Sequence, residues 1–441
     1  MGRVRVAIIG AGPTGLFLGA ALQRRGHAVT VVDRDGGPEP DGGWPRKGVM
    51  QFHHAHAFRG PVAGALAREL PEAFARWVEL GAEPVLAPGT DDVVGVRSQR
   101  STFERALRDV VAAERGLVLR QRHVRAVRHV DGVAIGLDVD GEPVPAELVL
   151  DASGRAGSAT RGLGPRAEFG GECGIAYVDR LYRLRPGAQG GPLTSPIAWQ
   201  GDYPGYQVLV FPHEGGMFST VIMRASHDAE LKLLRHDAAY DAACAAIPAL
   251  AAWTDAEVAE PVGSVFPGGS LLNHYRGQRR ADGQPVLSGL VAVGDAVATT
   301  TPNFGRGVTL AFMQAERLLA AVDEHGTDLD TVRDDFDAWC AASIAPWVRD
   351  HLDMDTAKAD RWGGADVDLT RPLPSDLVLA AGQQDPEIAR NLPPYLSMAG
   401  GPASLDVVQP AARRVYETGW RPAYTEGPTR DELARIVSSV V

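Results

Sequence analysis

A glycine-rich turn near the start of the chain joins a short apolar segment to an amphipathic one. Val4–Ile9 is apolar and largely β-branched, which is typical of a buried parallel strand. Gly10–Gly15, with the sequence GAGPTG, follows it, and Leu16–Arg25 continues with apolar residues at helical spacing. A second apolar strand, Val29–Val32, is followed directly by Asp33. This order of strand, GxGxxG, helix, strand and acid predicts a βαβ unit that binds a dinucleotide.

Each position in this unit has a physical role. Gly10 permits the tight turn, Gly12 lets the backbone approach a pyrophosphate at the helix N-terminus, and Gly15 lets helix and strand pack closely. Asp33 can accept a hydrogen bond from a ribose hydroxyl. A glycine turn without a ligand is the alternative, but the flanking strands and the acid argue against it. The residues expected to contact the dinucleotide here are Gly10, Gly12, Pro13, Thr14, Gly15, Asp33 and Arg34.

The composition is that of a globular protein with more than one packed unit. The 441 residues exceed what one hydrophobic core usually supports, and 45% hydrophobic with 22% charged residues is ordinary. The net charge of −11 and the absence of a basic block argue against nucleic acid as a partner. No apolar run reaches the ~18 residues of a membrane span, and the first strand leaves no room for a signal peptide. The three cysteines lack metal-ligand spacing, so we expect reduced thiols, no metal site and a cytoplasmic location.

The texture of the sequence changes from about residue 166. Short β-rich pieces separated by Gly and Pro, such as Ile175–Leu184, Tyr206–Phe211 and Met217–Met223, predict an antiparallel sheet. Leu290–Val293 is again a short buried strand, and it ends in Gly294-Asp295. The nucleotide-binding unit is therefore expected to be discontinuous, left near residue 165 and re-entered near residue 285.

Four local predictions can be compared with the structure. Leu117–Val124 is expected to be one strand, and Asp237–Trp253 one Ala-rich helix. Phe336–Trp362 is expected to be a long helical stretch that is kinked or broken at Pro346, because proline lacks the amide that a helix interior needs. Thr429 and Glu432 have the spacing of a capping box at the start of a last helix.

Three separated glycine–acid motifs together resemble those of the flavoprotein monooxygenases typified by p-hydroxybenzoate hydroxylase. The first is GAGPTG with Asp33. The second is Asp151–Arg155 (DASGR), followed by Ser158 and Arg161, and the third is Gly294-Asp295, followed by Pro302–Val308 (PNFGRGV). Their order and spacing match the family over residues 1 to 345. The DASGR and FGRG variants look most like a bacterial branch of FAD-dependent oxidoreductases that often carry a histidine-containing segment where this chain has GVMQFHHAHAF.

The resemblance implies an α/β fold class with three regions. These are a Rossmann-like FAD-binding domain (residues 1–165 and 285–345), an inserted antiparallel β-rich substrate-binding domain (166–284) and a helical C-terminal region (346–441). Substrate would then lie between the flavin and the antiparallel sheet. We expect about half of four aromatic residues to line that cavity and the others to lie in the core: Trp199, Tyr206, Phe211 and Phe218.

The resemblance also carries over FAD contacts. Asp295 would hold the ribityl chain, the loop after Pro302 would approach the flavin ring edge, and the following helix would aim its N-terminus at the flavin pyrimidine. Asp151 would lie near FAD and the pyridine-nucleotide route, although a turn-stabilising aspartate is the alternative. Arg46 and Arg100 match family arginines near FAD, with solvated surface arginines as the alternative. The full expected set is Arg46, Arg100, Val124, Asp151, Gly294, Asp295, Pro302, Gly305, Arg306, Gly307 and Val308.

His53, His54 and His56 are the candidate catalytic residues. The corresponding neighbourhood in the family lies beside the isoalloxazine ring, where an imidazole can orient substrate or exchange a proton near neutral pH. Nothing here resembles a zinc pattern such as HExxH. The alternative is that the three histidines are simply packed or solvated ahead of a helix.

The implied function is monooxygenation. NAD(P)H or a partner flavin reductase would reduce the FAD, and molecular oxygen would give a flavin hydroperoxide that delivers one oxygen atom to a small aromatic or polyketide-like substrate. One alternative is a dehydrogenase or reductase of the geranylgeranyl-reductase type, and another is a catalytically silent FAD-binding protein. Halogenation is rejected because the chain has no WxWxIP and no lysine from 48 to 231. Whether the chain is a monomer or a homodimer is left open.

Overall fold

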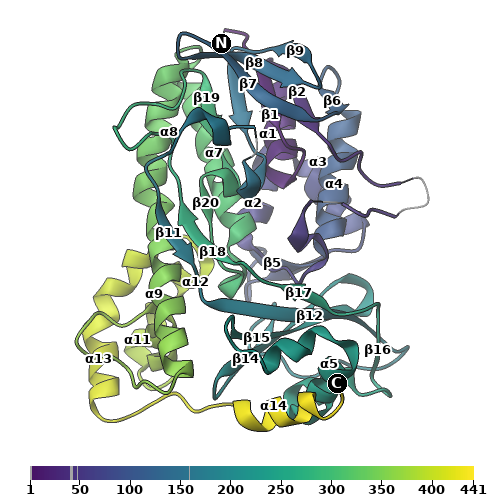
Figure 1. Cartoon of the computed structure of the whole chain (residues 1–441), viewed down its shortest axis with the longest axis vertical. Helices are drawn as coiled ribbons and strands as arrows, with labels where there is room; N and C mark the ends of the chain where they lie inside the picture. Colours follow the sequence, from purple (N-terminus) through teal and green to yellow (C-terminus); the bar gives the residue numbers. More distant parts are fainter. Residues whose placement is uncertain (1, 40–42, 47, 158) are drawn as a thin grey trace.

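A five-stranded parallel sheet lies in the upper part of the molecule in Figure 1, a computed structural model that describes residues 2–39, 43–46, 48–157 and 159–441. Ser158 of the second motif lies outside the described residues. The strand order is β19-β10-β1-β2-β6, so segments from both halves of the chain share one sheet. The strands are β1 (Arg5–Ile9), β2 (Ala28–Asp33), β6 (Val118–Gln121), β10 (Leu148–Asp151) and β19 (Leu290–Ala292).

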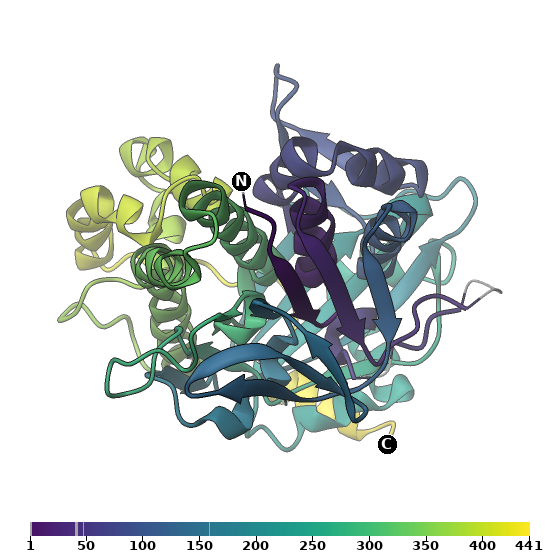
Figure 2. The ribbon, with the colours of Figure 1, turned by 90° about the horizontal axis from the view of Figure 1, so that it is seen from above.

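The two faces of this sheet are covered differently, as the strand alternation requires. Val6 and Ile8 of β1 pack into the core with the helices, whereas Ala7 and Ile9 pack against an antiparallel meander (Figure 2). The helices are α1 (Pro13–Arg24), α2 (Gly60–Glu69), α3 (Pro71–Glu79), α4 (Arg100–Ala113) and α7 (Gly307–His325). The meander is β7 (Val124–Val130), β8 (Val133–Val139) and β9 (Glu142–Pro145).

The predicted strand Leu117–Val124 is therefore wrong as a single element. The chain leaves the parallel sheet after Gln121 and enters the meander at Val124. The crossing between the two sheets falls at Arg122 and His123, where no glycine or proline marks the end of a strand in the sequence.

A six-stranded antiparallel sheet, ordered β13-β14-β15-β12-β16 with β17 beside β12, forms the lower part of the molecule in Figure 1. Its strands are β12 (Ile175–Leu184), β13 (Trp199–Tyr203), β14 (Tyr206–Pro212), β15 (Met217–Ala225), β16 (Ala259–Pro261) and β17 (Phe266–Gly268). Val208, Val210 and Ile222 face the covering helices, which are α5 (Asp237–Ala246), α6 (Pro248–Thr254) and α14 (Arg430–Ser438). Leu209, Val221 and Met223 face the opposite way.

The predicted helix Asp237–Trp253 is interrupted at Ile247. Ile247 has an extended backbone, and Pro248 begins the next helix at a position where its missing amide costs nothing.

Two small sheets complete the β structure: β11 (Phe169–Glu172), β18 (Leu272–Tyr275) and β20 (Ala298–Thr299) in one, and β3 (Phe58–Arg59), β4 (Glu83–Leu86) and β5 (Val93–Arg97) in the other.

The C-terminal part is helical. α8 (Leu329–Ser343) and α9 (Ala345–Trp362) are separated at Ile344, as the proline at 346 predicts. The following helices, α10 (Ser375–Ala381), α11 (Pro386–Arg390), α12 (Pro393–Ser397) and α13 (Gln409–Glu417), bury residues in the same core as α7. α14 instead crosses to the antiparallel sheet, and it begins with the predicted Thr429–Glu432 capping box. Within the described part of the chain, no helix has the length and apolar character needed to cross a bilayer.

Candidate active site

One cavity of about 680 Å³ lies at the carboxyl ends of the parallel strands and extends to the antiparallel sheet. Ligands bind at this edge in open α/β sheets because the loops there leave a crevice. One end is formed by the glycine turn and by Asp33, and the other by the inner face of the antiparallel sheet. The side chains at that second end are Tyr177, Leu209, Phe211, Val221 and Met223. Of the four aromatic residues expected in the wall, only Phe211 is there, since Trp199, Tyr206 and Phe218 point into the core under the covering helices.

The glycine turn has two tight positions and one open one. Gly10 has φ +104°, and a Cβ there would lie 2.6 Å from the Ala152 carbonyl oxygen. A Cβ on Gly15 would lie 2.0 Å from the Gly10 carbonyl oxygen, so Gly15 serves the packing of helix on strand and does not line the cavity. A Cβ on Gly12 would meet nothing closer than the Arg46 guanidinium at 3.9 Å. Since α1 begins next to Gly12 without a side-chain cap, its amide groups form an open anion site beside the cavity.

Asp33 and Arg46 brace this turn. The Ala11 amide donates to Asp33 Oδ2 at 2.6 Å, and Asp33 also lines the cavity. The Arg46 side chain is 2% exposed; it donates to Glu104 at 3.0 Å and to the Ala11 carbonyl at 3.1 Å. Arg100 donates to the other oxygen of Glu104 at 2.6 Å. The two predicted arginines therefore line the cavity as members of a carboxylate-bridged cluster rather than as solvated surface residues.

Asp295 is the one acidic side chain of the third motif, and it faces the cavity. Burial raises the pKa of its carboxyl, and the positive charges of Arg100, Arg155 and Arg276 oppose that rise. Asp295 is half-buried, and among the described residues none donates a hydrogen bond to its carboxylate, which is open to the cavity. The site is thus built to receive donors from a ligand, such as hydroxyl groups.

The loop between β20 and α7 is fixed by close packing at Gly305 and by the contacts of the Arg306 side chain. Phe304 has φ +62°, and Gly305 has φ +60° with a Cβ position only 2.6 Å from Ala57. Arg306 was expected to contact the cofactor, but it does not line the cavity. Its guanidinium pairs with Asp350 at 2.9 Å and lies 4.4 Å from the centroid of the Trp347 ring. Pro302, Gly305, Gly307 and Val308 do line the cavity.

A buried polar network connects this loop to α9. Asp355 accepts from the Asn273 side chain at 2.7 Å and from the Asn303 side chain at 2.6 Å, while Thr301 bonds His351 at 3.0 Å. Burial raises the pKa of Asp355 and lowers that of His351. Because α9 supplies these partners, the C-terminal helices fix the geometry of the loop at the cavity.

Four further predicted residues lie outside the cavity wall. Asp151 is fully buried and accepts from the Ser153 hydroxyl at 2.5 Å and the Thr160 hydroxyl at 2.6 Å, which favours the turn-stabilising alternative. The Gly294 amide donates to Gln314 at 2.9 Å and so orients the turn that carries Asp295. Val124 is the first residue of β7 and packs in the core between the meander and the parallel sheet, and Arg34 is exposed.

The three histidines have three different environments. His53 is exposed, stacks on Phe266 with ring centroids 5.7 Å apart and does not line the cavity. His56 lines the cavity, but its ring nitrogens contact the His54 carbonyl at 2.9 Å and Arg100 at 3.2 Å. His54 also lines the cavity, and its Nδ1 lies 2.7 Å from Asp179 Oδ1. Asp179 was not among the predicted residues, although it is the one acidic residue in the largely apolar segment Ile175–Leu184, which is a signal for a buried functional group.

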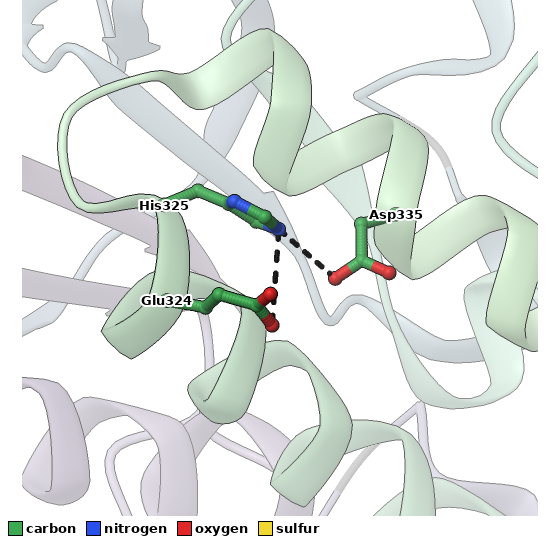
Figure 3. Close-up of side chains that lie close together, drawn as sticks. All are labelled: Glu324, His325 and Asp335. Carbon is green, nitrogen blue, oxygen red and sulfur yellow. Dashed lines mark hydrogen bonds and ion pairs between the residues drawn. The ribbon is translucent and has the colours of Figure 1, made fainter.

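A second polar cluster lies away from the cavity, where α7 meets α8 (Figure 3). Glu324, His325 and Asp335 place one ligand atom each within 4.8 Å of one another, which is the arrangement of a candidate metal site. The Arg317 guanidinium, however, pairs with Asp335 and neutralises its charge. We therefore interpret the cluster as an ion-pair group that fastens α8 to α7.

The fold and the cavity define a class, that of Rossmann-type FAD-binding proteins with an added antiparallel sheet. The solved structure of the flavin-dependent brominase Bmp2 matches with a TM-score of 0.68 and 15% identity over 95% of this chain and 100% of that one. Pseudomonas aeruginosa PqsL in complex with 2-aminobenzoylacetate matches with a TM-score of 0.61 and 16% identity over 82% of this chain and 98% of that one.

Sequence comparison gives two further similarities. Residues 3–51 match the family described as FAD binding domain. Kynurenine 3-monooxygenase of Xanthomonas campestris pv. campestris is 27% identical over 400 residues, which cover 84% of this chain and 83% of that protein. The chain is therefore similar to flavoprotein monooxygenases over most of its length, and it is an FAD-dependent oxidoreductase.

The residues present fit FAD on two observations of this structure. The space at Gly12, beside the uncapped start of α1, suits a pyrophosphate, and the unpartnered Asp295 carboxylate suits the ribityl hydroxyl groups. α7 begins at the cavity wall with Gly307, where a Cβ would meet nothing within 4 Å.

Proposed function

We propose that this protein transfers one atom of molecular oxygen to a small aromatic substrate, with NAD(P)H as the source of electrons. The observation that carries the proposal is the cavity itself, which passes from the anion site at Gly12, past Asp295, to an apolar chamber on the antiparallel sheet. Bound FAD supplies the redox chemistry and the activation of oxygen, so the protein has to bind, orient and exclude water.

The described side chains perform those tasks. Tyr177, Leu209 and Met223 provide the apolar wall against which an aromatic ring packs and from which water is displaced. The positive end of α7 lies at the cavity, where it would favour negative charge on a bound flavin. The relatives support this assignment, since the names of one sequence relative and one structural neighbour refer to kynurenine and to 2-aminobenzoylacetate, which are both small aromatic compounds.

We further propose that the FAD contacts are made by the predicted residues that line the cavity. These are Gly10, Gly12, Pro13, Thr14, Asp33, Arg46, Arg100, Asp295, Pro302, Gly305, Gly307 and Val308. The remaining predicted residues of the three motifs do not line the cavity but hold the lining loops in place through packing and hydrogen bonds: Gly15, Asp151, Gly294 and Arg306. The regions 1–165 with 285–345, 166–284 and 346–441 would then serve as FAD-binding, substrate-binding and supporting parts.

Halogenation receives no support from the described lysines, despite the brominase fold. Lys358 is buried and donates to Gln207 at 3.0 Å, Lys232 is exposed, and neither lines the cavity. A lysine that handles an oxidised halogen has to face the substrate chamber. Lys47 lies outside the described residues.

Oxygen uptake by the holoprotein tests the proposal. The protein is supplied with NADH or NADPH, and a panel of L-kynurenine, 2-aminobenzoylacetate, 4-hydroxybenzoate and 4-nitrophenol is added one compound at a time. We expect at least one compound to stimulate uptake and to be converted with less than one peroxide released per oxygen consumed. Uptake that is unaffected by every compound, with all oxygen recovered as peroxide, would refute an aromatic monooxygenase and favour a dehydrogenase or a silent flavoprotein.

A further inference from the structure

We propose that His54 and Asp179 act as a pair that takes the proton of an acidic hydroxyl group on the substrate, so that the substrate is a phenol or an enol. This inference rests on the proposed function and narrows its substrate class. The two residues come from distant parts of the chain, since His54 follows the short segment Met50–His53 and Asp179 lies in the middle of β12.

The contacts of Asp179 fix the ring of His54. Asp179 Oδ1 contacts His54 Nδ1 at 2.7 Å, and the Ala55 amide donates to Asp179 Oδ2 at 2.7 Å. The side chains are 5% and 2% exposed, so both groups are shielded from bulk water. Because a carboxylate accepts hydrogen bonds, Nδ1 is the nitrogen that carries the proton, and Nε2 keeps its lone pair. His54 lines the cavity, and within the described chain its Nε2 has no protein partner.

A buried carboxylate also favours a positive charge beside it. Burial raises the pKa of Asp179, and the hydrogen bonds from His54 and Ala55 oppose that rise. An imidazolium formed at His54 relieves the cost of the isolated buried charge, because the two opposite charges then lie in contact. Asp179 is thus a positioning residue, and His54 is the catalytic residue that accepts the proton.

Neither neighbouring histidine can take this role. Burial and the positive charge of Arg100 lower the pKa of His56 well below its usual range, so His56 does not hold an added proton. His53 is exposed, does not line the cavity and has no carboxylate partner among the described residues. Only His54 combines cavity access with an acidic partner.

The surroundings of His54 match a ring that bears a hydroxyl group. The Tyr177 ring meets the His54 ring edge to face, with centroids 5.0 Å apart, and Leu209 and Met223 belong to the same cavity wall. In the proposed step the substrate O–H bond breaks and an N–H bond forms at Nε2, with no change of oxidation state. The resulting phenolate or enolate is more electron-rich and therefore reacts faster with an electrophilic oxygen. The proton returns to the product oxygen or to water afterwards.

The ionisation of bound 4-nitrophenol tests the pair directly, since only its phenolate is yellow. The holoprotein is titrated with the probe at a pH equal to the probe's own pKa in solution, and the difference spectrum gives the ratio of phenolate to phenol in the bound state. We expect phenolate to exceed phenol at least tenfold in the wild type, and this ratio to fall about tenfold or more in His54→Gln and Asp179→Asn. The control His53→Gln changes an exposed neighbour and should match the wild type.

The outcomes separate this inference from the function on which it rests. Equal ionisation in the wild type, His54→Gln and Asp179→Asn, or no binding of the probe to the wild type, would overturn the pair. FAD content and thermal stability measured on the same samples report any merely structural damage. If the wild type ionises the probe as expected but no aromatic compound stimulates its oxygen uptake, the monooxygenase function is contradicted and the pair is not.

Discussion

Gly12 and Gly15 belong to one turn, but alanine at each position tests a different property of it. Gly15 has no room, because a Cβ would lie 2.0 Å from the Gly10 carbonyl oxygen and 3.4 Å from Ile8. Gly12 has room within the protein, and its φ of −77° and ψ of 179° suit alanine. The new methyl group at position 12 would occupy only the space assigned to the pyrophosphate.

The expected magnitudes follow from these geometries. In Gly15→Ala, α1 or the turn has to move, because the clash is with a backbone atom. Overpacking at the upper part of its usual range, about 2–3 kcal/mol, outweighs the gain of about 1 kcal/mol from helix propensity, so the free energy of unfolding should fall by about 1–2 kcal/mol. In Gly12→Ala the apoprotein should keep its stability or gain about 0.4–1 kcal/mol, since alanine restricts the unfolded chain. Its FAD affinity should fall about 10- to 100-fold or more, because one or two charge-assisted hydrogen bonds of about 1.5–3 kcal/mol each are displaced.

Two measurements on each apoprotein check this prediction. Urea unfolding gives stability, and quenching of FAD fluorescence on titration gives the dissociation constant. A Gly12→Ala protein that binds FAD within twofold of the wild type would refute the assignment of the pyrophosphate to this turn. A Gly15→Ala protein with unchanged stability would refute the packing role.

Four further predictions concern other parts of the molecule. Asp295→Asn should weaken FAD binding about 10- to 100-fold without unfolding the protein, because the ribityl hydroxyls lose a charged acceptor; binding within twofold of the wild type would show that Asp295 does not hold the ribityl chain. Arg306→Met should lower the free energy of unfolding in urea by about 3–5 kcal/mol, because Asp350 is left as an uncompensated buried charge. The double variant Arg306→Met with Asp350→Asn should recover part of that loss. Equal losses in the single and the double variant would exclude a charge effect. Burial lowers the pKa of His213 to about 4, so the unfolded state binds the extra proton. The stability that neutral His213 contributes is complete above 6.5, the pKa of the imidazole in the unfolded chain. It is lost as the pH falls from 6.5 to 4. The wild type should lose about 3 kcal/mol more over that range than His213→Gln, and parallel pH profiles would contradict this. Burial raises the pKa of Cys173 and Cys244 to about 12, and Cys340 is buried as well. A disulfide reagent should therefore label no thiol in the native protein and three after denaturation. Rapid labelling of the native protein would contradict this, because it would mean that a thiol is accessible.

The parts of the fold that depend on local sequence were predictable. The GAGPTG turn, the break before Pro346 and the Thr429–Glu432 capping box are each determined by residues within a few positions of one another. The confirmed fold class follows from the order of such elements. The single strand predicted at 117–124 was wrong because the chain changes sheets at Arg122 and His123, and no glycine or proline there marks the change.

The parts of the site that depend on distant partners were not predictable. Arg306 stands in a glycine-rich motif, yet its direction is set by Asp350 on α9, which nothing near residue 306 reveals. The choice of His54 over His53 and His56 likewise depends on Asp179, which lies on β12. Burial separates three adjacent histidines into an exposed ring, a ring beside an arginine and a ring paired with a carboxylate.

The central claim is that oxygen from O₂ reaches an aromatic substrate in this cavity, and the isotopic mass of the product tests it most directly. The holoprotein is supplied with NAD(P)H and ¹⁸O₂ in ordinary water, with the aromatic compound that gives the strongest stimulation of oxygen uptake. The account predicts a product that carries one ¹⁸O atom. A product without label would contradict it and place this protein among the flavin-dependent dehydrogenases.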